Sequence, residues 1–130
     1  MRALALGSLV SLALAGHARG EEAPGPAPGQ QAYEQYCLTC HGPAGKGDGP
    51  AGLAAVPMPR DFSVGRFKFD ADGDGHTGTD RDLFLVIRDG AASVGGNPLM
   101  APWGHLGDEQ VNELVGYVRS LEGGASGPAQ

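Results

Sequence analysis

The sequence predicts an all-α domain with long loops and with something other than side chains at its centre. Apolar residues recur at helical spacing in two segments, and no run alternates apolar and polar side chains as a strand does. The chain of 130 residues contains 23 glycines and 10 prolines, whereas aromatic residues make up only 6%. Such a chain loses much backbone entropy on folding and has few large side chains to bury. We therefore expect something other than side chains to fill its centre.

Residues 1–20 are typical of a cleaved export signal. The basic residue Arg2 is followed by an uncharged apolar stretch and then by a small-x-small motif, Ala18-Arg19-Gly20. The apolar stretch is shorter than the ~20 residues that span a membrane. The alternative is that the segment stays attached as a tether. We expect an exported, periplasmic protein.

The composition of the remaining chain divides it into three parts. Residues 21–28 and 123–130 are rich in glycine and proline, which predicts a flexible linker and a disordered tail. Residues 29–122 are then the folded domain. The formal net charge of −6 excludes nucleic acid and anionic membrane surfaces as partners and favours proteins with a basic patch.

A helix is predicted to begin after Thr79 and to end before Gly90. Thr79 suits the N-cap, and Asp82 stands three residues later, as in a capping box. Gly90 is suited to the position that follows a helix. The apolar stripe of this helix comprises Leu83, Val86 and Ile87.

A second helix is predicted over about residues 108–121. Its apolar residues fall on one helical face. They are Val111, Leu114, Val115, Val118 and Leu121. Gly107 stands at the N-cap, where glycine is acceptable.

Cys37 and Cys40, the two cysteines of the chain, form a Cys-x-x-Cys-His motif with His41. A disulfide here would close a very short loop and stabilise little, a thioredoxin-like dithiol would follow a strand, and a zinc site would need four suitably spaced ligands. The motif is also the attachment signature of c-type haem. Residues i and i+3 share a helical face, so two thiols can reach the vinyl groups on one side of a porphyrin while the histidine reaches the iron.

With this motif the chain resembles the class I cytochromes c, in particular their small bacterial members, over nearly all of residues 29–122. Gly29 and Tyr33 look like the glycine and aromatic residue of that family's first helix, which pack against its last helix. Gly116 and Tyr117 resemble their counterparts on the last helix. The resemblance implies a cytochrome c fold of three to four helices, whose long loops rich in glycine and proline wrap around one haem bound covalently through the two cysteines.

The resemblance also implies the axial ligands of the iron. His41 would bind on the proximal side, and Met100, in the segment Asn-Pro-Leu-Met-Ala-Pro-Trp, resembles the distal ligand. Met58, in a proline-rich stretch, is the alternative. Pro50 would accept a hydrogen bond from the second ring nitrogen of His41 through its carbonyl, unless it is only a turn residue.

Five other side chains have two interpretations each. Trp103 would pack against the haem or a propionate, or be a core or rim aromatic. Arg60 or Lys68 would neutralise a propionate, or be an ordinary surface charge. His76 and His105 are candidates for a bis-histidine site, or surface histidines.

The segment Asp-Ala-Asp-Gly-Asp-Gly at residues 70–75 begins like a calcium-binding loop. The twelfth position of such a loop should be glutamate, but here it is Arg81. The residues before the segment do not predict the helix that should precede it. We therefore expect a solvated acidic turn and no calcium site.

If His41 and Met100 both bind iron, no coordination position stays open for a substrate or for O₂. We therefore expect a one-electron carrier and not an enzyme. Its partners would be redox proteins with a basic docking patch, and it would meet membranes only through such partners. Two alternatives are a cytochrome c subunit of a larger oxidoreductase complex and a five-coordinate, ligand-binding cytochrome in which Met100 does not bind.

Overall fold

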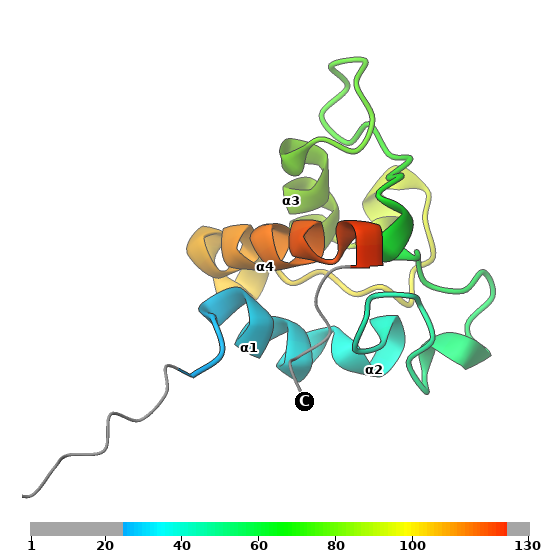
Figure 1. The fold of residues 1–130 in the computed structure, drawn as a ribbon. Coiled ribbons are helices and arrows are strands. Elements are labelled where there is room, and N and C mark those ends of the chain that lie inside the picture. The colour runs from blue at the N-terminus through cyan, green and yellow to red at the C-terminus, as the bar shows by residue number, and fades with distance from the viewer. Residues whose placement is uncertain (1–24, 125–130) are drawn as a thin grey trace, which may run out of the picture.

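The computed structural model describes residues 25–124, and within this range all regular structure is helical. The α-helices are α1 (Pro28–Tyr36), α2 (Leu38–His41), α3 (Asp80–Asp89) and α4 (Asp108–Ser120) (Figure 1). Short 3₁₀ segments punctuate the loops: η1 (Gly52–Ala54), η2 (Phe62–Val64), η3 (Ala91–Val94), η4 (Gly104–Leu106) and η5 (Glu122–Gly124). The predicted all-α class with three to four helices is confirmed, and residues 25–124 form four α-helices. The predicted leader, residues 21–24 of the predicted linker, and the tail beyond residue 124 lie outside the described residues.

Helices α1 and α4 pack against each other, and α3 packs on another side of α4 (Figure 1). Gly29 allows the close approach of α1, because a Cβ there would collide with the backbone carbonyl of Glu113. The rings of Tyr33 and Tyr117 lie beside it, with their centroids 4.9 Å apart. Gly116 was expected at this contact, but it is exposed and a Cβ there would meet nothing within 4 Å.

Helix α3 begins and ends as predicted. The Thr79 hydroxyl accepts a hydrogen bond from the Asp82 backbone N–H (3.1 Å), and the Asp82 carboxylate accepts one from the Thr79 backbone N–H (2.8 Å). Both halves of the capping box are therefore formed. Gly90 follows the helix with φ of +80°, a conformation that favours glycine.

Helix α4 supplies much of the core. Four of its predicted apolar positions are buried within the helix, and Leu121 is buried directly after it. Gly107 precedes the helix with φ of +85°, which explains why glycine replaces a side-chain cap there. None of the helices in the described part of the chain combines the length and the apolar character needed to cross a membrane.

Candidate cofactor site

The Cys-x-x-Cys-His motif lies at the junction of α1 and α2. Cys37 follows the last residue of α1, and its carbonyl accepts hydrogen bonds from the N–H groups of Cys40 (3.2 Å) and His41 (2.9 Å). Both thiols are free and half-buried. Burial, followed by the nearby Cys40, raises the pKa of Cys37 to about 12. One helical turn therefore carries the two thiols and the histidine.

His41 is the buried polar side chain at the centre of this site. It is 9% exposed, and its Nδ1 is buried with no hydrogen-bond partner. Burial lowers the pKa of His41 to about 4, although a backbone hydrogen bond with Arg60 opposes this effect. The imidazole is therefore neutral near pH 7, which is the form that binds a metal. A buried nitrogen without a partner is costly, so the site fits a group that ligates this ring.

The glycine-rich loop after His41 folds back onto α2. Gly47 N–H donates to the His41 carbonyl (2.9 Å), and the buried Tyr33 hydroxyl donates to the Gly42 carbonyl (2.7 Å). A Cβ at Gly52 would collide with the Cys40 carbonyl, so backbone alone can lie this close. These contacts fix the backbone on both sides of the histidine.

Pro50 lies in this loop, but the hydrogen bond predicted for it is not formed. The residue is exposed, and neither ring nitrogen of His41 donates to it: Nδ1 has no partner, and the hydrogen bond of the ring is with the backbone of Arg60. Pro50 instead occupies the turn that leads into η1, where Leu53 N–H donates to the Gly49 carbonyl (3.0 Å). The structure thus shows Pro50 as a turn residue, and its role as acceptor stays a prediction for the haem-bound protein.

Met100 lies in a loop that is tied to the end of α3. Its carbonyl accepts from Ala91 N–H (3.2 Å), its N–H donates to the Asn97 carbonyl (3.1 Å), and its side chain packs against the core. Met58 is 52% exposed and is not part of that core. The geometry supports Met100 as the inward-facing methionine, while Met58 stays the alternative ligand.

The loops that carry the two methionines lie side by side. The side-chain amide of Asn97 donates to the Pro57 carbonyl (3.2 Å), across 40 positions of the sequence. The same side chain accepts from Leu99 N–H (3.0 Å). Asn97 therefore both shapes the Met100 loop and links it to the Met58 loop. Sequence reasoning missed this residue, because an asparagine in a loop has no distinguishing pattern.

None of the other candidate residues is fully buried, although Trp103 packs against the core. Trp103 is half-buried, with its ring centroid 5.1 Å from that of Tyr36 and 5.7 Å from that of the exposed His105. Arg60 is exposed and forms no ion pair with any residue that the structure describes. His76 is exposed within the acidic loop. The structure brings neither His76 nor His105 into the buried core.

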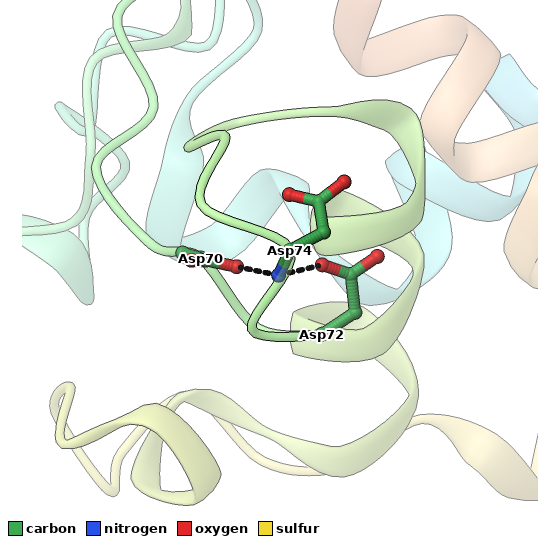
Figure 2. A group of neighbouring side chains, drawn as sticks. All are labelled: Asp70, Asp72 and Asp74. Atoms are coloured by element: carbon green, nitrogen blue, oxygen red, sulfur yellow. Dashed lines mark hydrogen bonds between the residues drawn. The ribbon is translucent and has the colours of Figure 1, made fainter.

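The acidic loop brings Asp70, Asp72 and Asp74 together, with one carboxylate oxygen of each within 4.8 Å of the others (Figure 2). Backbone N–H groups of the same loop already donate to these carboxylates. Asp70 accepts from Gly73 (2.7 Å), Asp74 (3.1 Å) and Gly75 (2.9 Å), and Asp72 accepts from Asp74 (3.2 Å). Such local bonds are typical of turns, and this arrangement supports the expected acidic turn.

Phe62 is the neighbour of His41 that sequence reasoning did not identify. Its ring is stacked on the imidazole, with centroids 4.5 Å apart and planes inclined by 18°. The sequence did contain one local signal, because Asp61 is a good cap for a short helical turn. The long-range contact itself has no sequence signature.

Comparison with known proteins gives two matches. A family model described as cytochrome c oxidase, cbb3-type, subunit III matches residues 24–118. A chain in the solved reducing HAO-like protein complex of Kuenenia stuttgartiensis is 34% identical, with a TM-score of 0.60. The match covers 73% of the present chain and 41% of that chain, so the present chain spans less than half of its neighbour. No curated protein matches the chain.

Proposed function

We propose that this chain carries single electrons through one covalently bound haem. The premise is that the chain belongs to the cytochrome c family described as cytochrome c oxidase, cbb3-type, subunit III. The observation that carries this proposal is the buried His41 with an unpartnered Nδ1, on the helical turn that also holds two free thiols. Haem iron, when bound, would supply one-electron chemistry by alternating between its ferric and ferrous states.

The side chains of the site have distinct parts in this proposal. The thiols of Cys37 and Cys40 would each add across a vinyl group, so that a carbon–sulfur bond forms and the thiol hydrogen moves to the other vinyl carbon. His41 would be the proximal ligand and Met100 the distal one, a pair that favours the ferrous state. The chain holds His41 at the end of α2 and Met100 on a hydrogen-bonded loop against the core, which would limit reorganisation on electron transfer.

Absorption spectra of the oxidised and reduced protein test the ligand set. We expect a low-spin c-type haem with the weak far-red band of methionine bound to ferric iron. Met100→Ala should abolish that band, and Met58→Ala, the matched control, should retain it. The reverse result would assign the distal position to Met58. A high-spin spectrum of the unaltered protein, with carbon monoxide binding at neutral pH, would instead support the five-coordinate alternative.

A second candidate function is that of a subunit in a larger oxidoreductase. The structural neighbour belongs to a protein complex and is much longer than this chain, which favours this alternative. Gel filtration of native extract distinguishes the two functions. A free carrier elutes at the size of one small domain, whereas a subunit elutes together with an enzyme activity.

Export to the periplasm and a basic partner complete the proposal. They rest on the predicted leader and on the net charge of −6. The mass of the mature protein should show cleavage after residue 20, and retention of the full leader would support a tether. Electron transfer to a partner with a basic patch should slow as ionic strength rises, because salt screens the attraction.

A further inference from the structure

We propose that Phe62 is a positioning residue that sets the plane of the His41 imidazole, an inference that rests on the proposed role of His41 as a haem ligand. The two rings are stacked with centroids 4.5 Å apart and an interplanar angle of 18°. Phe62 is 8% exposed and His41 is 9% exposed, so this stack is inside the protein. None of the roles proposed above for the side chains of the electron carrier involves Phe62.

The backbone holds Phe62 rigidly. Its N–H donates to the Gly45 carbonyl (2.7 Å), and a Cβ at Gly45 would lie 3.0 Å from the Phe62 ring. Asp61 caps η2 by accepting from Ser63 N–H (2.9 Å) and from the Ser63 hydroxyl (2.6 Å). The ring is therefore fixed by its own short helical turn and by the loop that follows His41.

The Phe62 ring has a second aromatic neighbour, which is itself supported by further contacts. Phe67 lies with its ring centroid 5.9 Å from that of Phe62, and the Arg119 guanidinium lies 5.2 Å from the Phe67 ring. Arg119 is held in turn by Asp80 (2.7 Å) and Glu122 (2.7 Å). The surface behind the imidazole is thus continuous with helices α3 and α4.

A ring that binds iron through one nitrogen can still rotate about the iron–nitrogen bond. The flat ring of Phe62, stacked on the imidazole, restricts that rotation, because turning the imidazole out of its plane would require Phe62 to move. The same surface covers one face of the buried imidazole. The orientation of an axial imidazole sets the splitting of the iron d orbitals. That splitting is measured by the g-values of the ferric protein and by the spread of its haem methyl proton shifts.

The test compares holoprotein variants by electron paramagnetic resonance and proton NMR. Phe62→Leu should change the g-values and the haem methyl shifts, and Phe62→Tyr, which retains the ring, should restore the pattern of the unaltered protein. Phe84→Leu is the matched control. Phe84 is a phenylalanine of similar burial (5%) on α3, with its ring beneath Arg81 and Arg88. It should lose stability while both spectra stay unchanged. Equal spectral changes in both leucine variants, or none in Phe62→Leu, would overturn the proposal.

One measurement requires no variant. In the ferrous holoprotein, nuclear Overhauser effects should connect the ring protons of Phe62 with those of His41, and their absence would overturn the proposal even if Phe62→Leu does not fold. The proposed function fails differently. In that case the protein would lack a covalent haem or would retain a low-spin haem spectrum in His41→Ala.

Discussion

Replacement of Asp82 by asparagine tests how much the acidic loop and α3 depend on one buried carboxylate. Asp82 is 1% exposed and has no cationic partner in the described part of the chain. One of its oxygens accepts from Ala71 N–H (2.5 Å) and Asp72 N–H (3.4 Å). The other accepts from the N–H and the hydroxyl of Thr79, both at 2.8 Å. Asparagine keeps one acceptor oxygen and replaces the other with a donor.

The expected cost follows from these bonds. Asp82→Asn loses the bonds at one oxygen and leaves at least one buried N–H facing another donor. A hydrogen bond to a charged group contributes about 1.5–3 kcal/mol, and a carboxylate at a helix N-terminus contributes about 0.3–1 kcal/mol. We therefore expect the free energy of unfolding to fall by about 2–4 kcal/mol at pH 7.

The same carboxylate predicts a dependence on pH. Burial raises the pKa of Asp82, but the hydrogen bonds from Thr79, Ala71 and Asp72 outweigh burial and lower that pKa below its usual value. The contribution of Asp82 is therefore complete above the unfolded-state pKa of about 4. It is lost as the pH falls through the lower folded-state pKa. The variant should lose less stability than the unaltered protein over this acidic range.

Urea unfolding of the holoprotein, followed by far-ultraviolet circular dichroism from pH 7 to pH 2.5, measures both effects. Asp108→Asn is the control, because Asp108 is an exposed aspartate in the first turn of α4 and makes no side-chain capping bond. It should cost only about 0.3–1 kcal/mol. The reasoning is refuted if Asp82→Asn costs no more than Asp108→Asn, or if its stability falls with acid as steeply as that of the unaltered protein.

Three further predictions concern the loops, the helix contact and the apoprotein. Asn97→Ala removes the hydrogen bond to the Pro57 carbonyl, worth about 0.5–1.5 kcal/mol, together with the one from Leu99 N–H, so imidazole should bind the ferric protein at least about twofold more tightly. Asn112→Ala, which removes the side-chain hydrogen bond to the Asp108 carbonyl within α4, should leave imidazole titrations unchanged, and equal effects would contradict a role of Asn97 in holding the Met100 loop. Gly29→Ala places a Cβ against the α4 backbone and should lower the free energy of unfolding, measured by thermal denaturation, by about 1–3 kcal/mol. Gly116→Ala, with open space around it, should stabilise the helix, and a neutral Gly29→Ala would contradict the close approach of α1 and α4. A variant with both cysteines replaced by alanine should give a largely unordered circular dichroism spectrum, and a native-like spectrum would show that the chain folds without haem.

Local chemistry explains what could be predicted from the sequence. The capping box at Thr79 and Asp82 lies within four residues, and the apolar residues of α4 recur at helical spacing. Both features can therefore be recognised from short stretches of sequence. The Cys-x-x-Cys-His motif also lies within one helical turn. These features determine the helices and the candidate attachment site independently of tertiary packing. The expectation for Gly116 went wrong because it depended on which side of α4 faces α1, and that contact is made at Glu113 and Tyr117.

Tertiary structure alone decided the surroundings of the site. Phe62 stacks on His41, Asn97 binds the Pro57 carbonyl, and Arg119 joins α4 to the loop before α3 through the Gly78 carbonyl (2.6 Å). Each contact joins segments that are far apart in the sequence, and none leaves a periodic or compositional pattern. Such contacts form only after the chain packs, because the position of each partner depends on every turn between them. The sequence by itself therefore determined the candidate haem-binding residues, and the fold decided what holds those residues in place.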